Sequence, residues 1–291
     1  MDKIIISTIE LSTEIKETLK IKFHGTSRGE MNSQKEKAER FAQLHAKGDP
    51  VILFNIWDTG SAKAVAEAGA KAIATGSHSV AEANGFDDGQ NFPLDAVLAN
   101  ITRIAASVDL PVTLDFEGGY AVDADGLREN ASRVIEAGAI GINFEDQVVG
   151  GEGLYSIEEQ SDRIAAIREA ADKSSIPLFI NARTDVFLKT LPAGATGEQL
   201  DEVVKRAAAY AKAGASGLFA PGLRDQDMIR QLCEASTLPV NIMVMPDTPS
   251  NKEMAGLGVA RISYGSGPYR KMIEWLKEAG RAALESLLKE T

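Results

Sequence analysis

The sequence has little cysteine, few aromatic residues and a deficit of positive charge. Its single cysteine, Cys233, excludes an intrachain disulfide and is typical of a protein from a reducing cytoplasm. The chain carries 31 Lys and Arg against 42 Asp and Glu, a formal net charge of -11, and no basic cluster reverses this field locally. Such a field repels phosphate polymers, so we expect no nucleic-acid partner.

Long apolar runs are also missing. The longest are strand-sized, well short of the roughly 20 residues that a membrane helix needs, so we expect no membrane span. The chain starts with Met1-Asp2-Lys3 and three isoleucines and then turns polar, without the apolar core of a secretory signal. We therefore expect a cytoplasmic protein. Cys233 lies at helical spacing among apolar residues, which favours a buried structural thiol over a nucleophile.

Proline and glycine divide the chain into regular units. Proline precedes four apolar runs and marks strand starts, at Pro50, Pro111, Pro177 and Pro239. Helical stretches that end in glycine, a residue suited to a left-handed C-cap, precede four others, at Gly69, Gly138, Gly214 and Gly258. The two kinds alternate and predict eight strands, near 50–58, 72–76, 111–117, 141–147, 177–185, 217–221, 239–245 and 260–265.

Strands that alternate with helical patterns predict a parallel α/β sheet, and eight such units favour a single TIM-type (β/α)8 barrel. An open, doubly wound sheet is the alternative, and it would need a glycine-rich dinucleotide turn after the first strand. That turn reads Trp57-Asp58-Thr59-Gly60-Ser61, so the dinucleotide fingerprint is absent.

The two ends of the chain depart from this rhythm. Residues 1–34 are rich in Glu, Lys, Ser and Thr, and we expect an appended, partly disordered segment there, with the barrel over 35–291. Residues 269–288 form an amphipathic pattern too long for an eighth barrel helix. We expect an extended C-terminal helix whose last turns contact a neighbouring subunit.

Active sites of such barrels lie at the carboxyl ends of the strands, where three expected strands turn polar. Residues two apart share a strand face. This groups Asp115 with Glu117, Asn143 with Glu145 and Gln147, and Asn181 with Arg183 and Asp185.

If these faces point inward, four carboxylates meet one arginine, Arg183, and this excess of negative charge is costly without a cation. Oxygen ligands without His or Cys suit Mg²⁺ or Mn²⁺ rather than zinc, and we favour Mg²⁺. The alternative is that some acids cap helices or pair with lysines, and that Asp185 orients Arg183.

Other polar segments allow two interpretations each. Residues 75–89 predict a long loop whose exposed N–H groups could hold a carboxylate, and His78 within it is more typical of a hydrogen-bonded turn than of a base. Gly265-Ser266-Gly267 favours a tight turn into the last helix over a phosphate site, because no basic residue precedes it. No lysine lies at an inward strand end, as a class I aldolase would require.

Five stretches together resemble the isocitrate lyase and phosphoenolpyruvate mutase superfamily, over a match from about residue 35 to 270. They are Trp57-Asp58-Thr59-Gly60-Ser61-Ala62, Asp115-Phe116-Glu117-Gly118-Gly119-Tyr120, Gly141-Ile142-Asn143-Phe144-Glu145-Asp146-Gln147, Asn181-Ala182-Arg183-Thr184-Asp185 and Gly258-Val259-Ala260-Arg261-Ile262-Ser263. The resemblance implies a barrel that binds Mg²⁺ and a small anionic 2-oxo-carboxylate and stabilises a pyruvate enolate. It also implies a homo-oligomer, a tetramer or dimer, in which the last helix is often exchanged between subunits.

The resemblance also implies roles for individual residues. The implied metal ligands are Asp115, directly, and Glu117, Glu145 and Asp88, through water. The implied substrate-binding residues are Thr75, Gly76, Ser77, Asn143 and Arg183, with the backbone of Gly76 and Ser77 at one carboxylate. Arg183 and Asp88 are the implied catalytic residues, and Arg183 grips the substrate carboxylate or leaving group.

Two departures from the family pattern narrow the reaction. Glu117 stands where members generally carry Asp, and residues 148–155 lack the cysteine-containing acid loop of the lyases. Cleavage of isocitrate or methylisocitrate is therefore disfavoured. The basic and amide residues of the mutase gating loop are also missing, which weakens phosphonate chemistry.

The favoured hypothesis is a Mg²⁺-dependent lyase that cleaves a carbon–carbon bond of a small 2-oxo acid, similar to oxaloacetate decarboxylase, since an enolate can take its proton from water. Phosphonopyruvate hydrolase or phosphoenolpyruvate mutase chemistry is the first alternative. A non-catalytic barrel that binds a 2-oxo acid is the second, and a phosphate-anchored isomerase or synthase that uses residues 265–267 is the third.

Overall fold

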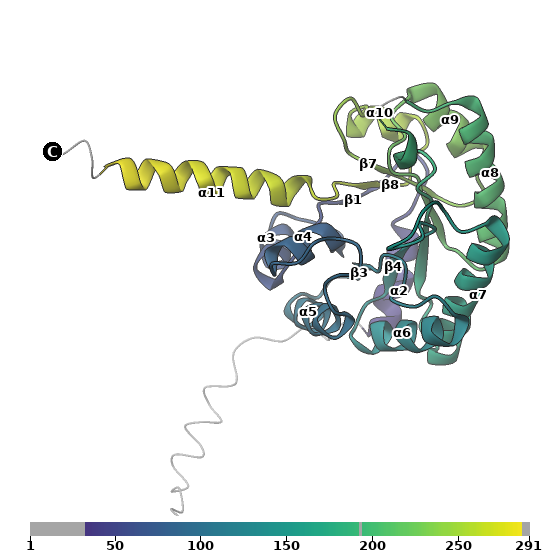
Figure 1. The fold of residues 1–291 in the computed structure, drawn as a ribbon, viewed down its shortest axis with the longest axis horizontal. Helices are drawn as coiled ribbons and strands as arrows, with labels where there is room; N and C mark the ends of the chain where they lie inside the picture. Colours follow the sequence, from purple (N-terminus) through teal and green to yellow (C-terminus); the bar gives the residue numbers. More distant parts are fainter. Residues whose placement is uncertain (1–32, 192–193, 287–291) are drawn as a thin grey trace, which may run out of the picture. The chain divides into compact units, whose positions relative to one another are not determined.

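Eight parallel strands form one sheet in the computed structural model, which describes residues 33–191 and 194–286 (Figure 1). They are β1 (Val51–Leu53), β2 (Ile73–Ala74), β3 (Val112–Asp115), β4 (Gly141–Glu145), β5 (Phe179–Arg183), β6 (Gly217–Phe219), β7 (Val240–Met243) and β8 (Arg261–Ser263). Neighbours pair in the order β1-β8-β7-β6-β5-β4-β3-β2. The predicted (β/α)8 barrel is confirmed, although every strand is shorter than expected because the flanking residues leave the ladder.

A short bridge brings β1 and β2 together and nearly closes the barrel. Ile56, which follows β1, pairs with Thr75, which follows β2. The Ile56 N–H donates to the Ala74 carbonyl at 2.9 Å, and the Gly76 N–H donates to the Ile56 carbonyl at 3.3 Å. The carboxyl ends of all eight strands therefore meet at one rim.

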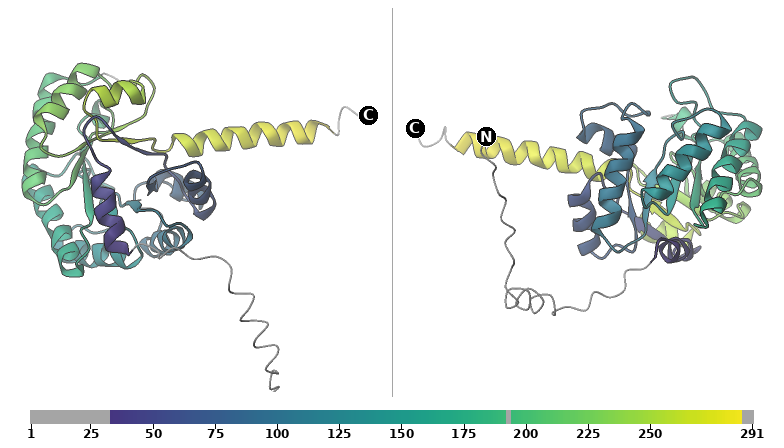
Figure 2. Two further views of the ribbon diagram at one scale, coloured as in Figure 1. Left: turned by 180° about the vertical axis from the view of Figure 1, so that it is seen from behind. Right: turned by 90° about the horizontal axis from the view of Figure 1, so that it is seen from below.

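Most helices follow a strand and cover the outside of the barrel, whereas the first helix precedes the strands and the last one extends away from the barrel (Figure 2). They are α2 (Gln34–Gln43), α3 (Thr59–Glu67), α4 (Ser77–Ala83), α5 (Leu94–Ser107), α6 (Ala124–Glu136), α7 (Ile157–Ser174), the 3-10 turn η1 (Leu188–Thr190), α8 (Gly197–Lys212), α9 (Gln226–Ala235), α10 (Asn251–Gly256) and α11 (Gly267–Ser286). The expected glycine caps have positive φ, for example 98° at Gly138 and 101° at Gly214, where any other residue would be strained.

Two apolar clusters form the core. The larger one fills the space between the strands and the outer helices and includes Phe116, Phe144 and Ile262. The smaller one lies at the amino-terminal ends of the strands, where Phe41 of α2 packs with Phe179, the first residue of β5. The inner residues further along the strands are polar, so the barrel interior changes from apolar to polar toward the rim.

The last helix, α11, extends away from the barrel (Figures 1 and 2). Its apolar side chains are exposed, with relative accessibilities of 64% for Trp275, 54% for Leu276 and 73% for Leu284. The predicted extended C-terminal helix is therefore present and reaches at least Ser286. Among the described residues, no helix is both long and apolar enough to span a bilayer. The appended segment was predicted over residues 1–34. Residues 1–32 lie outside those described, and the last two belong to the start of α2, with Ser33 as its N-cap and Gln34 as its first residue.

A partly buried histidine makes stability depend on pH. His45 stacks on Phe179 with ring centroids 4.0 Å apart, and its Nδ1 lies 2.8 Å from the Phe41 carbonyl. Burial, together with the positive charge of Arg261, lowers its pKa to about 3. An unfolded histidine has a pKa of about 6.5, so at intermediate pH the unfolded chain binds more protons than the folded one.

Stability should therefore fall as the pH drops below about 6.5, by up to about 1.4 kcal/mol per pH unit from this residue. Urea unfolding of wild type and His45→Phe between pH 8 and pH 5 measures the effect. We expect a shallower loss of stability in the variant, since phenylalanine keeps the ring contacts and cannot be protonated. Parallel pH profiles for the two proteins would contradict this assignment.

Candidate active site

A cavity of about 230 Å³ opens at the carboxyl ends of the strands. Six of the nine residues with implied site roles line it: Gly76, Ser77, Asp88, Asp115, Asn143 and Arg183. His78, Gly265 and Ser266, which the sequence analysis also discussed, line it as well. Thr75, Glu117 and Glu145 are buried next to these lining residues. The parallel strands thus bring together side chains that are more than a hundred positions apart in the chain.

Asp115, the last residue of β3, is held from three sides. Its N–H donates to the Thr75 hydroxyl at 3.0 Å, and its Oδ2 accepts from the Ser77 N–H at 3.0 Å. Its Oδ1 lies 3.4 Å from the Asn143 amide nitrogen. Because the N–H groups of Ser77 and Gly76 are both engaged within the protein, the Ser77 hydroxyl is the group of this pair that remains for a ligand.

Glu117 lies beyond the end of the strand that carries Asp115, although both residues line one small cavity. β3 ends at Asp115, and Glu117 has a φ of 51°, which turns the chain. Its carboxylate accepts from the Tyr120 hydroxyl at 2.7 Å and from the Gln90 N–H at 2.6 Å. Burial raises the pKa of Glu117 to about 7, and repulsion from Asp115 and Asp88 adds to the effect.

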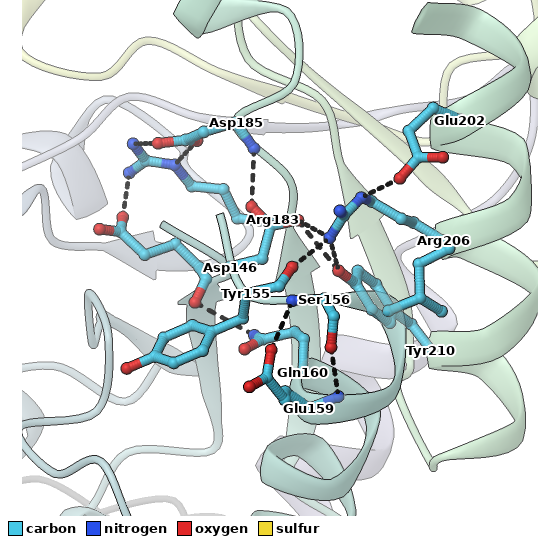
Figure 3. Close-up of polar contacts among 12 residues, drawn as sticks. Asp146, Tyr155, Ser156, Glu159, Gln160, Arg183, Asp185, Glu202, Arg206 and Tyr210 are labelled. Carbon is cyan, nitrogen blue, oxygen red and sulfur yellow. Dashed lines mark hydrogen bonds and ion pairs between the residues drawn. The ribbon is translucent and has the colours of Figure 1, made fainter. Parts of the chain in front are cut away.

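Arg183, the last residue of β5, is fixed by two carboxylates. Its Nε and Nη2 donate to the two oxygens of Asp185 at 2.6 and 2.9 Å, and its Nη1 lies 2.8 Å from Glu145 (Figure 3). Asp185 therefore orients Arg183, which was the alternative role expected for it. Burial raises the pKa of Glu145 to about 8 despite the opposing effect of Arg183.

A buried network behind this pair was not predicted (Figure 3). Asp146 is fully buried and accepts from the Asp185 N–H at 3.0 Å, from Arg206 at 3.0 Å and from the Tyr210 hydroxyl at 2.9 Å. Arg206 and Tyr210 come from α8, on the outside of the barrel. The network therefore links an outer helix, through Asp146 and Asp185, to the guanidinium of Arg183.

The carboxylates do not form a ready-made cage. Among residues 33–191 and 194–286, no group of three or more His, Cys, Asp or Glu side chains is arranged to hold a metal ion. The pKa values of Glu117 and Glu145 nevertheless respond to neighbouring carboxylates, Asp115 among them, so the negative charges do converge. This donor set suits an ion that takes one or two carboxylates and keeps its waters, as Mg²⁺ does.

Two features of the rim differ from the sequence analysis. The segment 75–89, expected as a loop, contains the short helix α4, and His78 within it accepts from Arg270 at 2.9 Å. Arg270 lies in the first turn of α11 and lines the cavity. Arg270 therefore supplies the basic residue that does not precede the turn at 265–267, because it follows the turn in sequence.

The family model for phosphoenolpyruvate phosphomutase matches residues 41–284 of the chain. The protein belongs to the phosphoenolpyruvate mutase family. This match confirms the resemblance to the isocitrate lyase and phosphoenolpyruvate mutase superfamily. The relatives of the chain in this superfamily are lyases and mutases, and the protein is an enzyme.

Three relatives illustrate the range of this family. The crystal structure of a candidate phosphonomutase from Burkholderia cenocepacia is 46% identical, with a TM-score of 0.84 over 86% of this chain and 100% of that one. The 2-methylisocitrate lyase of Escherichia coli is 31% identical over 80% of this chain and 79% of its own. The oxaloacetate decarboxylase of Pseudomonas entomophila is 26% identical over 79% and 78%.

The buried network gives a stability prediction. Arg206→Met leaves the Asp146 carboxylate buried without its cation, and we expect a loss of about 3–5 kcal/mol in the free energy of unfolding. Arg128→Met is the matched control, because Arg128 also contacts two carboxylates, Asp125 and Glu169, but at the surface. There we expect a loss of at most about 1 kcal/mol. Equal losses in urea unfolding would contradict the structural role of Asp146.

Proposed function

We propose that the protein is a Mg²⁺-dependent lyase that cleaves a carbon–carbon bond of a small 2-oxo acid through a pyruvate enolate, with oxaloacetate decarboxylation as the favoured reaction. The observation that carries the proposal is the presence of Asp115 and Arg183 in one cavity of about 230 Å³. A metal-binding carboxylate beside an anion-binding arginine suits a ligand that is small, anionic and metal-chelating.

The donor chemistry fits Mg²⁺. We assign Asp115 as the direct ligand and Glu117, Glu145 and Asp88 as residues that hold its waters. The raised pKa values of Glu117 and Glu145 support this, since a nearby cation would relieve the repulsion that contributes to them. Mn²⁺ suits the same oxygen donors. When bound, the ion supplies Lewis-acid stabilisation of the negative charge that develops on the 2-oxo group.

The chain's own side chains bind and orient the substrate in this proposal. Arginine has five N–H donors, and three of those of Arg183 are used by Asp185 and Glu145, which leaves two for the leaving carboxylate. We assign the Ser77 hydroxyl and the Asn143 amide, which line the same cavity, to the other carboxylate. Arg270 at the rim adds a second positive charge, which suits a diacid.

The source of the final proton favours decarboxylation. Cleavage of a methylisocitrate needs an acid beside the leaving group, and the cysteine of this chain is not available for that role. Cys233 lies buried on α9, and burial raises its pKa to about 11. An enolate formed by loss of CO₂ can instead take its proton from water. We therefore disfavour methylisocitrate cleavage for this chain, although a 2-methylisocitrate lyase is among its relatives.

A substrate panel tests the proposal. Pyruvate formation is followed from oxaloacetate, phosphonopyruvate and 2-methylisocitrate, with and without Mg²⁺, and corrected for the spontaneous metal-catalysed decay of oxaloacetate. We expect pyruvate from oxaloacetate that disappears with EDTA. Asp115→Ala should abolish this turnover, whereas Asp227→Ala, which removes an exposed carboxylate of α9, should not. Retained Mg²⁺ dependence in Asp115→Ala would refute the metal assignment.

The same panel separates the alternatives. Phosphate release from phosphonopyruvate would indicate a hydrolase. Conversion of phosphonopyruvate to phosphoenolpyruvate would indicate a mutase. The 46% identical candidate phosphonomutase favours this carbon–phosphorus bond chemistry as the second candidate. Oxalate binding without turnover of any substrate would indicate a barrel that binds a 2-oxo acid without catalysis.

We also propose that the protein is a homo-oligomer in which α11 packs against a second copy. The exposed Trp275 and Leu276 of α11 and an apolar cavity of about 530 Å³ beside β1 and α3, lined by Phe54 and Trp57 among others, support this. Sedimentation should give a multimer for the wild type and a smaller species for the double variant Trp275→Glu, Leu276→Glu. Val122→Glu, at a residue that is 74% exposed outside α11, is the control and should keep the wild-type mass.

A further inference from the structure

Arg261 is a cation inside the barrel that the proposed mechanism does not use. It is the first residue of β8 and is fully buried. Its Nη2 donates to the Asn143 Oδ1 at 2.9 Å and its Nε donates to the Ser263 hydroxyl at 3.3 Å. Both partners line the cavity of the candidate active site, so Arg261 lies directly behind the cavity wall.

This arginine is poorly compensated for a buried charge. Among the described residues no ion pair includes it, and its Nη1 has no hydrogen-bond partner. Its Cζ lies 6.0 Å from the centroid of the Phe41 ring, a distance at which a cation–π contact offsets little of the cost of burial. Burial lowers its pKa to about 9, and the more distant Asp115 opposes that shift. Burying a charge without a direct partner is costly, so packing alone does not explain why an arginine occupies this position.

Arg261 does determine which way the Asn143 amide faces. The Asn143 Oδ1 accepts from Arg261 and also from the Asn181 amide at 2.9 Å. With two donors on its oxygen, Asn143 must direct its NH₂ group the other way, where it lies 3.4 Å from the Asp115 Oδ1. A reversed amide would place an NH₂ group against the donors of Arg261 and an oxygen against the Asp115 carboxylate.

We propose that Arg261 is a positioning residue, which locks Asn143 with its NH₂ group toward Asp115 and the substrate, and that the chain tolerates a buried, unpaired charge for this purpose. The proposal rests on the proposed function in that it takes the cavity as the 2-oxo-acid site. It follows that the site is selective for ligands that present an acceptor oxygen to Asn143. It also follows that Arg261 weakens the fold while it strengthens ligand binding.

The test uses Arg261→Met in the full-length protein at pH 8, where His45 is neutral with or without the arginine. Oxalate with Mg²⁺ serves as the probe, because this planar dianion resembles the carboxylate and oxygen of a pyruvate enolate. We expect a melting temperature without ligand that is equal to or higher than that of the wild type. We expect an oxalate Kd at least about tenfold higher, the size of one lost hydrogen bond to a charged group.

Arg168→Met is the matched control. Arg168 donates to the carbonyls of Gly214 and Leu178 at 3.0 and 2.8 Å, away from the cavity. Its removal should lower the melting temperature and leave the oxalate Kd unchanged. If Arg261→Met instead behaves like this control, Arg261 has a structural role and the proposal is wrong.

Two further variants test the route through Asn143. Arg261→Lys keeps the charge and a donor and should recover part of the oxalate affinity. In an Asn143→Ala background, Arg261→Met should cause no further loss of affinity, since the amide it orients is gone; additive losses would overturn the proposal. If the wild type fails to bind oxalate, the proposed function is refuted instead. The assignment of Asn143 to the substrate site is then refuted too. The melting temperatures without ligand do not depend on that function.

Discussion

The excess of negative charge at the carboxyl ends of β3, β4 and β5 is the constraint on which the rest of the site depends. Burial, with added repulsion from neighbouring carboxylates, makes these groups resist ionisation, and it raises the pKa values of Glu117 and Glu145. Three arginines at different depths partly balance this negative charge: Arg270 at the rim, Arg183 within the cavity, and Arg261 behind the cavity wall. A divalent cation among the acids would complete this arrangement.

Much of the fold could be predicted from the sequence because it follows from local chemistry. Glycines that must end helices and prolines that precede strands set the period of the barrel, and Gly138 and Gly214 have the left-handed conformation that this requires. The identity of the strand-end residues was also predictable, since Asp115 and Arg183 are the last residues of β3 and β5. Up to these residues, side chains two positions apart in a strand face the same side: Asn181, which contacts the lining residue Asn143, and Arg183 both point to the barrel interior.

What the sequence did not reveal begins where the strands end. The turn at Glu117 depends on a backbone conformation that alternation cannot anticipate, and the helix α4 lies in a segment whose composition suggested a loop. The contacts of Asp146 with Arg206 and Tyr210, and of His78 with Arg270, join residues 60 to 192 positions apart. Only the folded barrel brings such residues together, so no local sequence pattern predicts these contacts.

The helix α11 contributes to the cavity with its first turn and is exposed along its later turns. Its first turn supplies Arg270 to the cavity, and its later turns expose Trp275 and Leu276. The guanidinium of Arg270 can be only as rigid as the helix that carries it. If α11 packs against a second copy as proposed, that surface also fixes the position of Arg270 at the mouth of the cavity, and turnover per subunit would then vary with protein concentration in dilute solution.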